Sequence, residues 1–98
     1  MIRVLIERYL ADGKVSEYYQ AIRQLKQKAG QMDGYLSGEM LIDPEDSRRC
    51  LVLSNWQDIE SWKLWANSDK RNIAKDKIRK MLIEDEKISI YETALNKP

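Results

Sequence analysis

The chain has 98 residues, of which 17 are Lys or Arg and 16 are Asp or Glu, so its formal net charge at pH 7 is +1. A chain of this length usually forms one domain, and its near-neutral charge provides no general attraction to nucleic acid or to anionic membranes. It has no histidine and one cysteine, which excludes Ser-His-Asp and Cys-His catalysis, a His-ligated metal or haem, and an internal disulfide.

Nothing in the sequence is typical of export or of a membrane span. The longest apolar runs, such as residues 50–53, are far shorter than the ~20 residues that a membrane-spanning helix needs. The N-terminus also lacks the layout of a signal peptide. We therefore expect a cytoplasmic protein formed by a single domain over residues 1–98, with residues 95–98 as a loose tail.

The first part of the chain predicts three strands and one helix. Residues 2–10 alternate roughly between apolar and polar side chains and predict a strand. From Lys14 the apolar spacing changes to steps of three and four, which predicts an amphipathic helix that ends at Gly30. Residues 35–43 and 48–56 then predict two strands joined by a hairpin loop, the later one with apolar residues on both parities.

The remainder predicts two short helices and a last strand. Asp58 and Ser68 are suited to be the N-caps of the two helices. Residues 87–93 alternate again and predict a strand. The order β-α-β-β-α-β, with the second helical segment divided, is that of an α+β ferredoxin-like fold. Its antiparallel sheet has the strand order 4-1-3-2 and carries the helices on one face.

The two central strands predict a homodimer. In the first strand, apolar residues occupy both parities, with Ile2, Val4 and Ile6 on one and Leu5 and Tyr9 on the other. The third strand is also apolar on both parities. A sheet that has helices on only one face needs a second layer over the other, and a second copy of the sheet is the economical cover.

The segment 52–68 resembles the antibiotic biosynthesis monooxygenase domain family. In that family a strand ends in Trp, a short helix carries one or two further Trp or aromatic residues, and a Ser caps the next helix. In this chain the matching residues are Trp56, Trp62, Trp65 and Ser68. The start of the second strand, at Gly34-Tyr35, and the closing strand at 88–91 match the family layout as well, so the resemblance covers about residues 2–93.

The resemblance implies a dimeric α+β barrel, in which two sheets face each other and a pocket lies between each sheet and its own helices. Family members include cofactor-free oxygenases of polycyclic phenols, haem-degrading monooxygenases and small isomerase-like proteins. Haem degradation relies on an Asn in the first strand, a Trp in the short helix and an axial His in the next helix. The matching positions here hold Glu7, Trp65 and, approximately, Lys75, so we do not expect haem degradation.

We expect instead a cofactor-independent monooxygenase that acts on a small aromatic or phenolic substrate, with no cofactor and no metal. Such an enzyme removes a proton from an electron-rich substrate, stabilises the oxyanion and excludes water. The isolated glycines form no phosphate-binding loop for a flavin or nicotinamide, which agrees with this interpretation.

Two alternatives come from other classes of protein. One is a non-catalytic, dimeric ligand-binding or accessory protein of the same fold. The other is an RNA recognition motif, which shares this element order but carries aromatic residues on its central strands. Those aromatic residues are missing from the stretch 48–54, so we expect no nucleic-acid partner.

Glu7 is the candidate general base. A carboxylate near the middle of a central strand has a raised pKa if it faces an apolar layer of helices. The alternative is an ion pair with a neighbouring Arg or with the partner subunit. Trp65 is expected to line the pocket, although its spacing from Trp62 also suits plain core packing.

Four further residues are expected to line the pocket. The amide of Asn55 could orient a ligand or bond to a loop. Tyr35 could donate a hydrogen bond at the pocket rim or simply pack its ring. Arg71 and Lys75 belong to a basic segment, 68–80, which could attract an anionic or phenolate substrate or form a solvated helix face.

Overall fold

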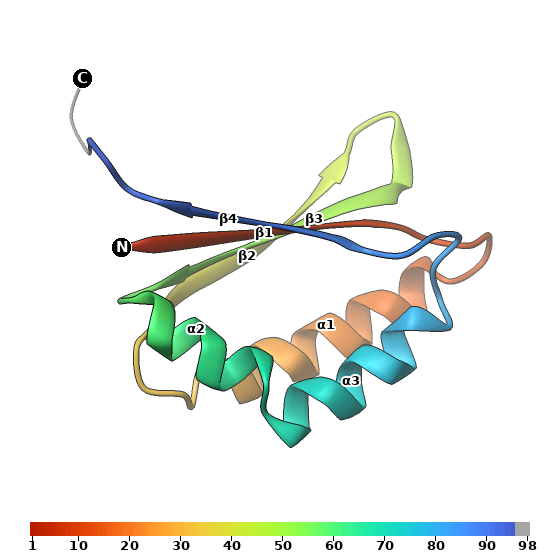
Figure 1. Cartoon of the computed structure of the whole chain (residues 1–98). Helices are drawn as coiled ribbons and strands as arrows, with labels where there is room; N and C mark the ends of the chain where they lie inside the picture. The colour runs from red at the N-terminus through yellow and green to blue at the C-terminus, as the bar shows by residue number, and fades with distance from the viewer. Residues whose placement is uncertain (96–98) are drawn as a thin grey trace.

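The computed structural model describes residues 1–95 and shows a four-stranded sheet with three helices (Figure 1). The elements are β1 (Ile2–Tyr9), α1 (Val15–Ala29), β2 (Tyr35–Asp43), β3 (Asp46–Trp56), α2 (Ile59–Ala66), α3 (Asp69–Arg79) and β4 (Lys87–Glu92). This order confirms the predicted α+β arrangement, including the division of the second helical segment. None of the helices in the described part of the chain is long and apolar enough to cross a bilayer.

The sheet has the strand order β2-β3-β1-β4, with every neighbouring pair antiparallel. Read from the other edge, this is the ferredoxin-like order 4-1-3-2, so the predicted topology is confirmed. All three helices lie on one face of the sheet, and the opposite face, which we call the open face, carries no helix (Figure 1). The central strands β1 and β3 therefore have two different environments, one under the helices and one on the open face.

The alternation along β1 decides which residues meet the helices. Ile2, Val4, Ile6 and Arg8 are buried, whereas the residues between them are exposed or half-buried. Successive strand residues point to opposite faces, so the buried set lies under the helices and the intervening set, which includes Glu7, lies on the open face. The residues of β3 are divided between the two faces in the same way, because Ile6 lies opposite Val52 and Glu7 lies opposite Leu51.

Local signals explain where α2 and α3 begin. The Asp58 carboxylate accepts a hydrogen bond from the Ser61 backbone N–H at 2.8 Å, and the Ser68 hydroxyl accepts one from the Arg71 N–H at 3.2 Å. Each cap satisfies a backbone donor that has no partner within its helix. Both predicted N-caps are therefore confirmed. Gly30 occupies the C-cap of α1, as the sequence predicts.

The core consists of two clusters of buried side chains between the helices and the sheet. The first contains the three tryptophans packed against Ile2, Val4 and Ile6 of β1. The second gathers residues of α1, β3 and α3 around Tyr18, which is fully buried, and includes Leu10 just after β1 and Met81 just after α3. The site described below lies where these two clusters meet.

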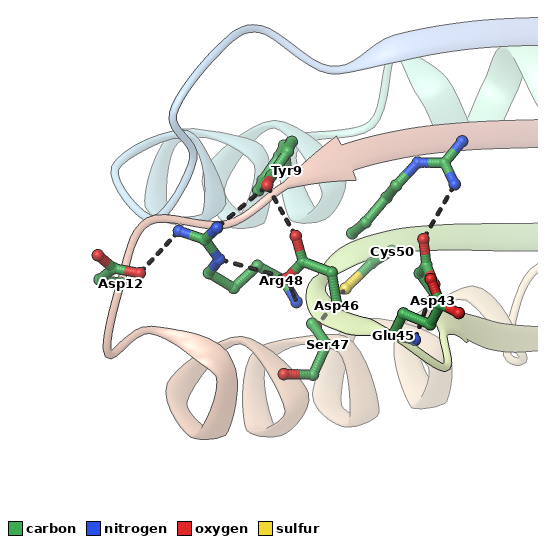
Figure 2. Close-up of polar contacts among 9 residues, drawn as sticks. Tyr9, Asp12, Asp43, Glu45, Asp46, Ser47, Arg48 and Cys50 are labelled. Atoms are coloured by element: carbon green, nitrogen blue, oxygen red, sulfur yellow. Dashed lines mark hydrogen bonds and ion pairs between the residues drawn. The ribbon is translucent and has the colours of Figure 1, made fainter.

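A polar cluster joins the β2–β3 hairpin to the end of β1 (Figure 2). The Tyr9 hydroxyl donates to the Asp46 carboxylate at 2.7 Å and accepts from the Arg48 guanidinium at 3.1 Å. Arg48 also pairs with Asp12, in the turn that leads to α1, at 2.7 Å. The hairpin is thus held by charged hydrogen bonds at the rim of the sheet.

At the C-terminal end, Leu95 is exposed. The rest of the predicted loose tail, residues 96–98, lies outside the described residues.

Candidate functional site

A cavity of about 360 Å³ lies between the sheet and the helices. Its apolar wall comes from α1 and from β2 and β3, and includes Ile22, Leu25, Met40 and Val52. A second hollow, of about 410 Å³, lies on the open face and is lined mainly by exposed and half-buried residues, many of them charged. We take the first as the candidate site because aromatic and apolar walls with a few polar groups are typical of small-molecule sites.

One end of the cavity is aromatic. All three tryptophans of the chain line it, and each is at least 96% buried, with exposed fractions of 0% to 4%. Trp56 ends β3 and lies nearly parallel to Trp65, at 6.4 Å between ring centroids and an interplanar angle of 25°. Trp62 and Tyr35 meet Trp56 edge-on, at 5.9 Å and 5.2 Å. Such packing orients the rings rigidly and provides a flat surface for an aromatic ligand.

Gly38 makes room for the Tyr35 ring at this end. A Cβ atom at Gly38 would collide with the Tyr35 hydroxyl, so the close approach of that ring to β2 requires glycine. Burial raises the pKa of the Tyr35 phenol. Tyr35 is therefore a neutral phenol at physiological pH, and its hydroxyl can donate or accept a hydrogen bond.

The other end of the cavity is cationic. Arg8 and Arg71 both line it, with exposed fractions of only 5% and 4%. Arg8 pairs with the Glu86 carboxylate, with 3.0 Å from both Nε and Nη2 to Oε1, and its Nη1 donates to the Tyr18 hydroxyl at 3.0 Å. Arg8 thus has strong partners on several of its donors.

The buried charge of Arg71 has weaker partners than that of Arg8. Among the described residues, its guanidinium has one polar contact, from Nη2 to Glu86 Oε2 at 3.6 Å, which is longer than a hydrogen bond. Its central carbon lies 5.3 Å from the centre of the Trp62 ring, a cation–π distance. Burial lowers the pKa of Arg71, while the charge of Glu86 raises it and that of Arg8 lowers it.

The Arg8–Glu86–Arg71 cluster therefore holds two buried positive charges and one negative charge. The mouth of the cavity adds Arg23 and Lys26, which are exposed on α1. Within the described part of the chain, the carboxylate that lines this cavity belongs to Glu39, which is exposed. The electrostatic potential of the cavity consequently favours an anionic ligand or an anionic form of a neutral one.

Three of the predicted site residues line the cavity, namely Trp65, Tyr35 and Arg71. Glu7 does not face the helices beside Trp65, which was the condition for its proposed role as a general base in the pocket. Glu7 is exposed on the open face, opposite Leu51 and Lys87, because its parity is the reverse of the buried set of β1. Its carboxylate lines the hollow on the open face instead.

Asn55 and Lys75 also lie outside the cavity, so the expectation that they line it is wrong. Asn55 shares the open face with Arg3, and its amide donates to the Ser37 hydroxyl at 2.9 Å. Lys75 faces the last turn before β4 and lines a separate hollow with Glu86 and Asp85. Asn55 lies outside the cavity because its position in β3 points to the open face. Lys75 lies outside it because it is about one turn further along α3 than Arg71, toward the segment before β4.

The sequence analysis missed Arg8 and Glu86. Arg8 continues the even-numbered series of Ile2, Val4 and Ile6, so its burial could have been found from that periodicity. Glu86 precedes β4 in an irregular segment and is 78 positions from Arg8 in the chain. No local signal could have found it, because its role depends on a long-range contact.

The sequence profile of the family "Antibiotic biosynthesis monooxygenase" matches residues 1–75 of the chain. No protein with a curated description matches it in sequence. Solved structures share its fold at low identity. A conserved protein from Methanosarcina mazei Go1 has a TM-score of 0.87 and 21% identity, over 92% of this chain and 89% of that one.

A second similar structure, of a proposed antibiotic biosynthesis monooxygenase from Deinococcus radiodurans, has a TM-score of 0.91 and 17% identity, over 100% of this chain and 97% of that one. A third is that of SnoaB, a cofactor-independent oxygenase from Streptomyces nogalater, with a TM-score of 0.85 and 9% identity, over 99% and 97% of the two chains. At these identities the structures show a common fold.

Proposed function

The chain belongs to the antibiotic biosynthesis monooxygenase family, and on that premise we propose that it is a cofactor-independent monooxygenase of a small phenolic substrate. The observation that carries this proposal is the cavity itself, in which an aromatic wall lies next to buried cations. An aromatic ring can pack against the tryptophans, while the cationic end favours the electron-rich, anionic form of the substrate. The name of SnoaB supports the proposal, since it describes a cofactor-independent oxygenase of the same fold.

The proposed reaction converts an activated ring methylene of the substrate into a carbonyl group. Loss of a proton makes the substrate an electron-rich anion that reduces dioxygen, the co-substrate. One oxygen atom forms the new C=O bond, and the two hydrogens leave with the other oxygen as water. In this reaction the tryptophan wall holds and orients the ring, the apolar lining excludes bulk water, and the positive potential stabilises the anion.

The experiment that tests this function measures dioxygen consumption with dithranol, a phenolic anthrone with an activated methylene. With ¹⁸O₂, we expect one labelled oxygen atom in the new carbonyl group of the product. Trp65→Phe should lower kcat/KM by about tenfold, because a smaller ring leaves the substrate less well oriented. Leu64→Ala, at an exposed position on the same helix, serves as the matched control and should leave the rate unchanged. Dioxygen consumption no faster than the uncatalysed rate, or a product without ¹⁸O in the new carbonyl group, would contradict the proposal.

A non-catalytic ligand-binding role is the second candidate, and one observation favours it. The carboxylate that we expected to act as the proton acceptor, Glu7, lies on the far side of the sheet from the cavity. Saturable binding of dithranol without dioxygen consumption would support this second function.

We also propose that two copies of the chain pair through their open faces. Leu5 lies opposite Leu53, and Leu51 lies opposite Leu41, so apolar side chains continue across β1, β3 and β2. Leu41 is 43% exposed. A second sheet over this stripe would remove the apolar area from water.

A further inference from the structure

We propose that Arg71 is the binding site for an anionic oxygen attached to the aromatic ring of the ligand. The cavity would then select aryl oxyanions, either phenolates or aryl carboxylates, over neutral aromatic molecules of the same shape. This inference rests on the proposed function in one respect only, since it takes the same cavity as the ligand site. It needs no turnover, because it concerns binding.

The charges of the Arg8–Glu86–Arg71 cluster do not balance. Both oxygens of Glu86 face guanidinium groups, but the short contacts go to Arg8 at 3.0 Å, and Arg71 is 3.6 Å away. Even if Arg71 and Glu86 moved together, two cations would share one carboxylate. One positive charge in this cluster therefore remains without a counter-ion among the described residues.

The Arg71 side chain is also almost completely buried. Only 5% of the Arg71 side chain is exposed, and a buried charge is costly unless it is paired and hydrogen-bonded. Arg71 lines the cavity, so the group that could complete its pairing would come from inside that cavity. A ligand oxyanion can accept a charge-assisted hydrogen bond from the planar guanidinium, with two parallel bonds if it is a carboxylate.

Arg71 also lies next to the aromatic wall of the cavity. The Arg71 guanidinium lies over the ring of Trp62, which itself packs edge-on against Trp56. An aromatic ring bound against this wall therefore has the cation within reach of its oxygen substituent. Arg23 and Lys26 at the mouth add a positive potential on the path of entry, which raises the local concentration of anions.

This arrangement has a consequence for a phenol. A cation next to the bound oxygen stabilises the phenolate, so the pKa of the bound phenol falls, by one unit for each tenfold by which the phenolate binds more tightly than the neutral phenol. The O–H bond breaks in the binding step and the proton goes to water. The protein then needs no carboxylate in the cavity to generate the anion.

The test compares three probes without dioxygen: 4-nitro-1-naphthol, whose phenolate absorbs visible light, 2-naphthoate, and 1-nitronaphthalene as the neutral aromatic. Binding is measured by calorimetry and by quenching of tryptophan fluorescence. We expect at least one of the two anions to bind about tenfold or more tightly than the neutral probe, the scale of one charge-assisted hydrogen bond. If 4-nitro-1-naphthol binds more tightly and its pKa is lowered in the complex, Arg71 binds a phenolate oxygen. If 2-naphthoate binds more tightly, Arg71 binds a carboxylate.

The variants then identify the residue. Arg71→Gln should remove the preference for anions, whereas Lys70→Gln, which removes the same charge from an exposed neighbour on α3, should retain it. If Arg71→Gln does not fold, Arg71→Lys keeps the charge without the planar fork and should retain part of the preference. Equal binding of all three probes to the unmodified protein, or full preference in Arg71→Gln, would overturn the proposal.

The two proposals can fail separately. Selective binding of anions without dioxygen consumption would leave the Arg71 site standing and remove the monooxygenase function. Dioxygen consumption without any preference for anions would support the monooxygenase function and overturn the Arg71 site.

Discussion

At the scale of single residues, the most consequential feature is that charged side chains are buried at the end of a cavity. Arg8 and Glu86 are buried together, with side-chain exposed fractions of 2% and 10%. Two ions can be buried at acceptable cost only if they stay paired, since the desolvation of each is repaid by the other. The pair thus connects β1 to the segment before β4 and also shapes the cavity.

Arg8→Gln should therefore destabilise the protein strongly. It leaves Glu86 buried with only the distant Arg71, and removal of one partner of a buried pair typically costs about 3–5 kcal/mol. The free energy of unfolding, measured by urea denaturation, would show the loss. Arg79→Gln makes the same chemical change at an exposed position on α3 and should alter stability by less than about 0.5 kcal/mol. Equal effects of the two substitutions would show that the buried pair contributes nothing to stability.

Three aspartates, of which Asp43 and Asp46 are half-buried and Asp58 is exposed, make the stability of the fold depend on pH. The pKa of Asp46 is lowered chiefly by the hydrogen bond from Tyr9, that of Asp43 by the backbone N–H of Glu45, and that of Asp58 by the Ser61 hydroxyl. The unfolded chain then binds protons more readily than the folded one. Their stabilisation is present above the ordinary pKa of 3.8 and is lost as the pH falls through the lower folded values.

We accordingly expect the Tm to fall as the pH drops below about 4. Asp46→Asn should lower the Tm at pH 7, and its difference from the unmodified protein should shrink toward pH 2 as Asp46 takes up a proton. Asp76→Asn, on the exposed surface of α3, is the control and should show little difference at either pH. A difference that persists unchanged at pH 2 would mean that Asp46 does not act through its charge.

At the scale of elements, the connection from α1 to β2 positions Tyr35, which belongs to the aromatic end of the cavity. Gly34 has a φ of +85°, a left-handed conformation that favours glycine, and a Cβ there would collide with the Ser61 side chain on α2. The Gly34 carbonyl also accepts a hydrogen bond from the Gln57 N–H at 2.8 Å. The start of β2, with Tyr35, is thereby held against the start of α2.

Gly34→Ala should cost more stability than Gly13→Ala. Both glycines have a positive φ, 85° and 77°, so both variants pay the penalty of about 1–2 kcal/mol for a left-handed residue. Gly13 has open space around its Cβ position, whereas Gly34 has Ser61. Thermal or urea unfolding of the two variants measures the difference, and equal losses would show that contact with α2 does not constrain this turn.

At the scale of the whole molecule, the sheet separates two surfaces with different roles. The cavity lies under the helices, and the proposed dimer interface lies on the open face. Pairing of the open faces would therefore leave the mouth of the cavity, at Arg23 and Lys26, accessible to a ligand. It would also cover the hollow that contains Glu7.

Light scattering at micromolar concentration should give a mass of twice 11.6 kDa. Leu41→Glu places a charge in the apolar stripe of the open face, so it should shift the protein toward the monomer. Leu64→Glu, at a position 69% exposed on α2, makes the same change away from the stripe and should leave the dimer intact. A mass of 11.6 kDa for the unmodified chain would contradict the proposed assembly.

The sequence by itself determined the element order and the N-caps at Asp58 and Ser68, because these depend on periodicity and on hydrogen bonds within a few residues. The sheet topology was predicted from that element order, which is the one of a ferredoxin-like fold. It also pointed to Trp65, Tyr35 and Arg71, through the resemblance of the segment around the tryptophans and the basic character of α3. Each of these patterns lies within a short segment, so it can be recognised without knowledge of the fold.

Only the tertiary structure decided the charge of the cavity. Neighbouring residues of a strand point to opposite faces of the sheet, so only one of Glu7 and Arg8 can face the cavity. Both faces of β1 carry apolar residues, so the sequence did not show that this residue is Arg8. The pairing of Arg8 with Glu86 joins residues 78 positions apart. A contact of that range depends on how the irregular segment before β4 packs beside β1, and no local pattern in the chain encodes it.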